Sequence, residues 1–196
     1  MKLRRSFYER DTLIVAKDLL GKYLVHKIDK ELTSGMIVEV EAYIGPEDQA
    51  SHAFDGLKSK RTYIQYGPGG FSYTYLIYGV YTCFNIVTNV SGKPEVVLIR
   101  ALEPIEGIDI MKERRRTSNN TNLCNGPGKL CISLGISQED YGVDLCEDQL
   151  YLVDGLNINK SEIIATPRIN IDYSGIAKDY LWRFYIKDNK YVSKNK

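Results

Sequence analysis

The chain has 196 residues and a formal net charge of +1, and its residues are 43% apolar and 26% charged. These proportions are those of an ordinary globular protein and argue against disorder. No segment approaches the roughly 20 apolar residues that cross a bilayer, and the basic N-terminus lacks the apolar stretch of a signal peptide. The four cysteines are too few and too irregularly spaced for a disulfide framework. We therefore expect a cytoplasmic protein with reduced thiols and no membrane contact.

In chain order, the sequence predicts a mixture of helices and strands. Asp11 is a suitable N-cap for a first helix over residues 11–20, and Gly21 is a suitable stop. The other expected elements are strands over 23–28 and 36–44 joined through 30–34, a long loop over 45–70, a hairpin over 71–88, a strand over 95–102, helices over 105–116 and from 124–130 onward, and strands over 149–153, 162–171 and 181–186. This pattern predicts a single mixed α+β domain over residues 1–196, with a curved, largely antiparallel β-sheet flanked by helices and a protruding β-hairpin.

The hairpin expected over residues 71–88 has a tyrosine at its tip. Tyr78 and Gly79 form its only turn signal, among β-branched and aromatic residues that favour strands. An exposed tyrosine on a tight turn forgoes burial, so we expect the tip to contact a partner. A three-residue turn or a bulge would place Tyr75 and Asn85 on one face, whereas a strict two-residue turn would not.

Two carboxylates and a phenol share one face of the strand expected over residues 36–44. Glu39, Glu41 and Tyr43 alternate there with apolar residues at a period of two. An edge strand would expose this face to solvent, whereas in a sheet covered on both faces a buried carboxylate must be paired. Arg100 follows a nearly continuous apolar run and also needs a partner if it is buried, so Glu39 and Glu41 are its candidate carboxylates.

The charged residues are segregated along the chain. Residues 58–61 and 112–116 form basic clusters, whereas residues 139–148 are acidic. This distribution favours a basic side that binds a polyanion, and solvated helix faces are the alternative. Gly126 precedes an expected helix whose first backbone amides could hold a phosphate, and a plain helix start is the alternative there.

The residue inventory argues against metal and cofactor chemistry. The chain has two histidines, His26 and His52, and no Cys-x-x-Cys pair, so we expect no metal site. It also lacks a dinucleotide fingerprint and a Walker loop, so we expect no cofactor. His26 lies in an apolar strand, where we expect a structural role. The remaining acids, arginines, tyrosines and asparagine are typical of a hydrolytic or a binding site.

Four motifs occur in order along the chain. They are VEAYIGPED over residues 40–48, followed by His52; YTYLIYG over 73–79, with Asn85; LIRALEP over 98–104; and GPGKL over 126–130. Together they resemble the alkyladenine (3-methyladenine) DNA glycosylases, from about the first expected helix to Tyr185. The resemblance implies removal of damaged purines from double-stranded DNA, with alkylated purines as the main substrates and deaminated purines as further candidates.

The resemblance also implies roles at the reacting bond and on the DNA. Glu41 matches the general base that activates a water, and Arg100 matches the residue beside that water, where it would keep Glu41 ionised. Tyr78 matches the aromatic wedge that fills the gap left by the flipped nucleotide. Arg61 and Lys129 are expected to contact the DNA backbone. The motifs contain no obvious Schiff-base lysine, so we expect a monofunctional enzyme without a lyase step.

Other matching residues form the expected base pocket. Tyr43, His52 and Tyr75 match the side chains that sandwich the flipped base, and Asn85 matches the wall that discriminates between bases. A cationic alkylated purine would stack on the tyrosine faces by a cation–π attraction of about 0.5 to 2 kcal/mol. The chain departs from the family in the loop after the histidine, where residues 59–62 are Ser-Lys-Arg-Thr and the family usually has Thr-Pro-Arg-Asn.

Two other functions remain as alternatives. A non-catalytic DNA-damage binding module would use the basic side and the Tyr78 wedge but would not need Glu41. A hydrolase of free nucleosides would use Glu41 and the stacking pocket but would not need Tyr78 or the basic clusters. Of the three, we favour a monomeric enzyme that acts on double-stranded DNA containing damaged purines and associates with the nucleoid.

Overall fold

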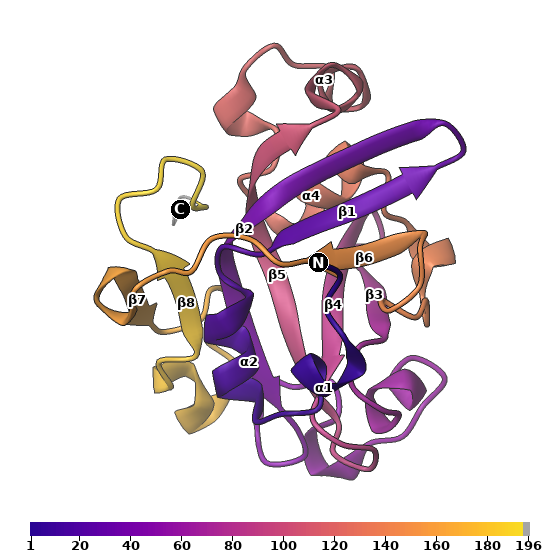
Figure 1. Cartoon of the computed structure of the whole chain (residues 1–196). Helices are drawn as coiled ribbons and strands as arrows, with labels where there is room; N and C mark the ends of the chain where they lie inside the picture. The colour runs from indigo at the N-terminus through magenta and orange to yellow at the C-terminus, as the bar shows by residue number, and fades with distance from the viewer. Residues whose placement is uncertain (194–196) are drawn as a thin grey trace.

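An eight-stranded antiparallel sheet organises the structure, a computed structural model that describes residues 1–193 (Figure 1). Six strands follow the order β3-β4-β5-β2-β1-β6, while β8 pairs with β2 and β7 pairs with β8. The strands are β1 (Tyr23–Ile28), β2 (Glu31–Ile44), β3 (Ser72–Ile77), β4 (Tyr81–Thr88), β5 (Glu95–Glu106), β6 (Leu150–Val153), β7 (Ile163–Thr166) and β8 (Arg183–Ile186). The predicted fold class, a single mixed α+β domain with a largely antiparallel sheet, is confirmed.

Strand β2 lies inside the sheet and carries the acidic face predicted from the sequence. It pairs with β1, β5 and β8, and both Glu39 and Glu41 are fully buried. The register between β2 and β5 shifts on both sides of Glu39, which marks a β-bulge near the carboxylates. The alternative of a solvated edge strand is therefore wrong, because neighbouring strands cover both sides of this segment.

One face of the sheet carries the hydrophobic core. Helices α2 (Thr12–Leu19) and α4 (Pro127–Leu134) pack on this face, and both lie against the sheet in Figure 1. The strand residues in this core include Val40, Ala42, Phe84, Ile86, Val97 and Ile99. Because side chains alternate along a strand, the residues between these positions lie on the opposite face, where Glu41, Asn85 and Arg100 are found. The candidate site therefore lies on the face opposite this core, and the N-terminal part of α4 reaches its border.

The strand register aligns functional residues in a row across that opposite face. Tyr73 pairs with Asn85, and Asn85 pairs with Leu98 of the next strand. Leu98 in turn pairs with Glu41, and Glu41 pairs with Arg183. Residues more than a hundred positions apart in sequence are thus neighbours because four antiparallel pairings place them at one level of the sheet.

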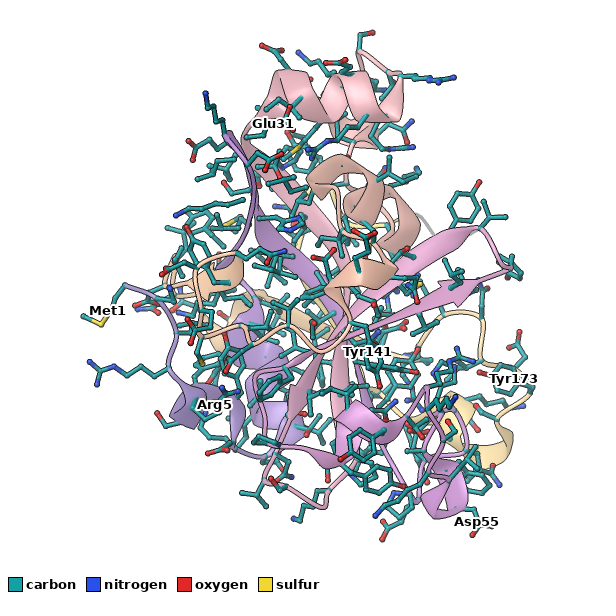
Figure 2. The ribbon with its side chains drawn as sticks, turned by 90° about the vertical axis from the view of Figure 1, so that its right-hand side faces the viewer. Met1, Arg5, Glu31, Asp55, Tyr141 and Tyr173 are labelled. Carbon is teal, nitrogen blue, oxygen red and sulfur yellow. The ribbon has the colours of Figure 1, made fainter. Side chains whose placement is uncertain are left out.

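The hairpin formed by β3 and β4 projects beyond the sheet, because β4 pairs with β5 only from Asn85 onward. Figure 2 shows this hairpin extending from the body on the same side as Tyr173. Ile77 pairs with Tyr81, so the turn has three residues, and of the registers that the sequence left open the structure has the one that places Tyr75 and Asn85 on one face. At the tip, Tyr78 adopts a φ of 53°, which is unusual for a residue with a side chain.

Helix α2 follows the sequence prediction closely, but other helices differ. The Asp11 carboxylate accepts hydrogen bonds from the amides of Leu13 and Ile14, as expected for an N-cap. The short helix α1 (Arg5–Tyr8) was not expected. Helix α3 (Ile108–Arg115) begins later than predicted, because β5 continues to Glu106. Beyond Leu98 only β2 pairs with β5, so the open edge of β5 tolerates a proline in this extension.

Two strand boundaries also differ from the prediction. Strand β2 begins at Glu31 rather than 36, because Asp29 adopts a left-handed conformation that closes a tight turn after β1. The strand expected over 162–171 is limited to β7. The chain then leaves the sheet, and the Arg168 side chain pairs with buried Asp48 while the amide of Ile169 donates to Glu41. The long loop over 45–70 contains two short 3-10 helices, Phe54–Gly56 and Tyr63–Tyr66.

Candidate active site

A groove of about 670 Å³ lies on the site face, between the projecting hairpin, α4 and the segment around residue 170. Tyr173 is one of the residues that line it, and in Figure 2 this residue lies below the hairpin. The groove brings together seven of the nine residues predicted from the sequence: Tyr43, His52, Arg61, Tyr75, Tyr78, Arg100 and Lys129. Among residues 1–193, the charged side chains that line it are four cations and no acids: Arg61, Arg100, Arg115 and Lys129. Such a lining suits a polyanion.

Glu41 lies beneath this groove with its carboxylate fully buried and bonded. Its Oε2 accepts hydrogen bonds from the Tyr43 hydroxyl at 2.8 Å and from Nη1 of Arg100 at 3.2 Å, and its Oε1 accepts from the amide of Ile169 at 2.8 Å. All three partners are donors, so they fix the position of both carboxylate oxygens. A carboxylate offers about four acceptor positions, and donors within residues 1–193 occupy three of them, two on Oε2 and one on Oε1.

Arg100 joins the two buried carboxylates of β2, as the sequence predicted. Its Nε donates to Oε1 of Glu39 at 3.2 Å, and its Nη1 reaches Glu41. Burial opposes the arginine charge, but the negative charges of Glu41 and then Glu39 outweigh it and raise the pKa of Arg100 above its usual value. Glu39 also accepts from Arg183 at 2.7 Å and from both the amide and the hydroxyl of Ser193. Glu39 is therefore an anchor for Arg100, and Glu41 is the carboxylate next to the groove.

Tyr43 stands between the carboxylate and the groove. Burial, followed by the nearby charge of Glu41, raises the pKa of Tyr43 well above its usual value, so its hydroxyl stays protonated and donates to Glu41. The guanidinium of Arg168 lies over the Tyr43 ring, 4.7 Å from its centroid. Both carboxylate oxygens of buried Asp48 hold Arg168 in that place. Arg168, held by Asp48, therefore fixes the Tyr43 ring by packing on one of its faces.

His52, Tyr73 and Tyr75 form an aromatic cluster at the inner end of the groove. The ring of His52 packs edge-on against Tyr75 with centroids 4.6 Å apart, and its Nδ1 lies 2.7 Å from the Tyr73 hydroxyl. Arg61 donates to Nε2 of His52 at 3.0 Å. Because arginine can only donate, Nε2 accepts and Nδ1 carries the proton. Burial raises the pKa of Tyr73 to about 12, so this cluster presents neutral aromatic faces.

We predict that His52 stays uncharged down to about pH 4. Burial, followed by the charge of Arg61, lowers the pKa of His52 from 6.5 to about 4. Between these two values the unfolded chain binds a proton at His52 that the folded chain does not, so this group makes the folded state less stable as pH falls from 6.5 to 4. NMR titration of the imidazole signals in the wild type and in Arg61→Gln would measure the pKa of His52. We expect a higher His52 pKa in the variant, and a wild-type midpoint near 6.5 would contradict the assignment.

A smaller cavity of about 50 Å³ continues from the groove behind the aromatic rings. The groove and the cavity share Tyr43, His52, Tyr75 and Tyr173 as lining residues. Asn85 lines this inner cavity, and its Nδ2 donates to the backbone oxygen of Tyr73 at 3.0 Å. The predicted wall residue is therefore at the closed end of the pocket rather than along the groove.

The hairpin tip and the two predicted DNA-contact residues lie around the groove. Tyr78 is 80% exposed and Val80 is 72% exposed, so the tip presents apolar side chains to solvent. The Arg61 guanidinium lies over the ring of Tyr75, 4.8 Å from its centroid, across the mouth of the aromatic cluster. Nζ of Lys129 donates to the side-chain oxygens of Asn122 and Asn125. Contacts of Arg61 and Lys129 with a DNA backbone stay predictions.

Four further residues of the site were not predicted from the sequence. Ile169 contributes only its backbone amide, and Arg168 and Tyr173 come from a stretch expected to be strand or unassigned loop. Gln65 lines the inner cavity from the 3-10 helix Tyr63–Tyr66. Of these four residues, only Arg168 could have been identified as a candidate from the sequence. An arginine beside apolar residues requires a carboxylate partner if it is buried.

The described part of the chain offers neither a metal cluster nor a membrane-spanning helix. Among residues 1–193, no three or more His, Cys, Asp or Glu side chains are grouped so that they could hold a metal ion. No helix within this range is both long and apolar enough to cross a membrane. His26 is buried, with Nδ1 2.9 Å from the backbone oxygen of Leu134 and Nε2 3.5 Å from Asp140, which agrees with the structural role expected for it.

Comparison with known proteins identifies the family. The family model described as methylpurine-DNA glycosylase matches residues 6–190. Similar proteins named "Putative 3-methyladenine DNA glycosylase" include one from Clostridium acetobutylicum, 53% identical over 98% of both chains, and one from Clostridium novyi, 51% identical over 98% of both chains. Another, from Bacillus mycoides, is 50% identical over 99% of this chain and 100% of the relative. The resemblance inferred from the four motifs is confirmed, and the chain belongs to the methylpurine-DNA glycosylase family.

Proposed function

We propose that this chain is a monofunctional DNA glycosylase that flips an alkylated purine out of duplex DNA and hydrolyses its N-glycosidic bond with a water activated by Glu41. One observation carries this proposal. The fully buried carboxylate of Glu41 accepts hydrogen bonds from Tyr43 and Arg100. It lies next to a groove with aromatic walls and a cationic lining. A hydrolytic group, a surface for stacking a base and a surface for phosphates therefore meet in one place.

The aromatic cluster supports selection of a cationic base. A purine alkylated at a ring nitrogen carries a positive charge, and the faces of Tyr43 and Tyr75 attract it by about 0.5 to 2 kcal/mol more than a neutral base. His52 is neutral at physiological pH, because its pKa is lowered to about 4, so it does not repel that charge. The Arg61 guanidinium lies over the face of Tyr75. Arg61 would leave this face when a base enters.

The buried carboxylate supports the hydrolytic step. As the glycosidic bond breaks, its electron pair moves to the departing base, and positive charge develops on the sugar, as in glycoside hydrolysis. The oxygen of a water then bonds to the anomeric carbon, and Glu41 takes a proton from that water. Arg100 and the amide of Ile169 hold the carboxylate in place. The products are a free base and an abasic strand.

The absence of a lyase step is part of the same proposal. Lys129 is the one lysine that lines the groove in the described part of the chain. Its ammonium is held between the side chains of Asn122 and Asn125, which favours a positional role over a nucleophilic one. We further propose that residues 1–196 form one glycosylase domain, active as a cytoplasmic, nucleoid-associated monomer without a cofactor. The family match over residues 6–190 supports the domain assignment.

The test is an assay on a duplex that carries one alkylated purine, with a chelator present. We expect chromatography to show release of the free base, and we expect the strand to stay intact until alkali cleaves it at the abasic site. Cleavage without alkali would overturn the monofunctional assignment. Tight binding without release would favour a damage-binding module, and equal activity on a free alkylated nucleoside would favour a nucleoside hydrolase.

A further inference from the structure

Gln65 is a buried polar side chain with unused hydrogen-bonding capacity. It is 1% exposed, and within residues 1–193 neither its Oε1 nor its Nε2 has a partner at full hydrogen-bond geometry, although the side chain interacts with the Tyr73 hydroxyl and lowers the pKa of Tyr73. No other side chain in that range leaves two buried polar atoms unpaired in this way. Because buried polar groups are nearly always bonded, an incompletely bonded amide in a native protein calls for an explanation, and a ligand that completes its bonds is one.

Gln65 lies at the wall of the proposed base pocket. Gln65 lines the cavity of about 50 Å³ together with Tyr43, His52, Tyr73 and Asn85. The backbone around it is fixed, since the amide of Gln65 donates to the Thr62 carbonyl at 3.0 Å and the amide of Ile64 donates to the Tyr141 hydroxyl at 3.3 Å. Figure 2 shows Tyr141 near the centre of this side of the molecule.

The neighbouring polar groups bond to one another, and Gln65 adds only an interaction with the Tyr73 hydroxyl that falls short of full hydrogen-bond geometry. Asn85 donates to the backbone of Tyr73, and the Tyr73 hydroxyl bonds to His52. His52 in turn accepts from Arg61. The cavity exceeds the 10 to 15 Å³ that a single water requires, so in the absence of a base solvent can occupy it. A flipped base that enters between the aromatic rings would meet the Gln65 amide at the closed end.

The chemistry of the amide indicates which base edge it would bind. A glutamine amide presents one acceptor and one donor side by side, and this pair matches the N6 amino group and N7 of adenine. Guanine presents two acceptors, O6 and N7, on the same edge, and a methyl group on N7 removes one of them. The Gln65 amide can therefore form two bonds with 3-methyladenine but at most one with 7-methylguanine.

We infer that Gln65 is a specificity-determining residue that reads the N6 and N7 edge of the flipped purine and favours adenine-derived over guanine-derived lesions. This inference rests on the proposed function, since it requires a base in the pocket. A bidentate amide–adenine pair discriminates by about 1 to 3 kcal/mol, which corresponds to roughly 5-fold to 150-fold in rate. The expected effect is thus a change in lesion preference rather than a uniform loss of activity.

The test uses DNA treated with a methylating agent, which carries 3-methyladenine and 7-methylguanine in one substrate. Released bases are quantified from the same reaction for the wild type, Gln65→Met and Gln65→Glu. Methionine has similar volume without hydrogen bonds, and glutamate has the same shape without the donor. We expect the ratio of 3-methyladenine to 7-methylguanine release to fall about tenfold or more in Gln65→Met, and also to fall in Gln65→Glu.

The possible outcomes separate the inference from the proposed function. Removing an incompletely bonded buried amide should not lower the melting temperature, so Gln65→Met is expected to fold, and Gln65→Glu serves as the second variant. Release of both bases with the same ratio in the wild type and both variants would overturn this inference alone. A parallel fall in both bases would show that Gln65 only supports the pocket. No release by the wild type would overturn the proposed function and this inference with it.

Discussion

Replacing Glu41 with glutamine is expected to slow base release from an alkylated duplex by about 10³-fold or more, within the range that a positioned general base contributes. Glutamine keeps the size of the side chain but cannot take a proton from water or stabilise the sugar cation with a full negative charge. Duplex affinity should change little, because Glu41 is buried beneath the groove and does not line it. Single-turnover kinetics and fluorescence anisotropy on the same substrate measure the two quantities.

Two matched variants separate the chemical role of Glu41 from a structural one. Glu39→Gln alters the other carboxylate on Arg100, so it should lower the free energy of unfolding but retain much more activity than Glu41→Gln. Tyr43→Phe removes one donor to Glu41 and keeps the stacking ring, so a moderate loss is expected. If Glu41→Gln lost lesion binding together with activity, or matched Glu39→Gln in rate, the general-base assignment would be wrong.

Replacing Tyr78 with serine is expected to weaken binding to a lesion-containing duplex by about 10-fold to 100-fold, because stacking of an aromatic side chain on bases contributes about 1 to 3 kcal/mol. Tyr78 is 80% exposed at the end of a three-residue turn, so its ring has few contacts to lose within the protein. In the complex it would fill the space that the flipped base vacates and offset the loss of stacking. Binding isotherms on a lesion duplex measure this effect.

The control for this prediction is the neighbouring Val80→Ser, which removes another exposed apolar side chain from the same tip. We expect a much smaller loss of duplex binding there. A damaged free nucleoside provides the second control, since it has no vacated stack to fill, and Tyr78→Ser should affect it little. Equal losses on duplex and nucleoside would contradict the wedge assignment, and so would equal losses for Tyr78→Ser and Val80→Ser.

Local patterns were sufficient to predict the acidic strand and its arginine. Period-two alternation placed Glu39 and Glu41 on one face, and the cost of burying Arg100 alone required a carboxylate, so their pairing followed from electrostatics. The hairpin register could be narrowed to two options because a shift of one residue moves every side chain to the other face. The structure then selected the three-residue turn.

Other features depend on tertiary contacts that no local pattern encodes. The amide of Ile169 approaches Glu41 from 128 positions away in sequence, and any residue type could supply that bond. Gln65 looks like an ordinary polar residue until the fold buries it in the inner cavity. The predicted end of β5 was placed too early, because a proline in a sequence normally marks the end of a strand. In the structure β5 continues through Pro104, where it pairs with β2 alone.

The most direct test of the account is a structure of the Glu41→Gln variant bound to a duplex with one alkylated purine. We predict that the purine lies in the pocket against Tyr75 and Tyr43, that Tyr78 fills the vacated stack, and that the anomeric carbon faces the side chain at position 41. The account would be contradicted if the purine stayed stacked in the duplex, or if it occupied another cavity with its sugar turned away from position 41.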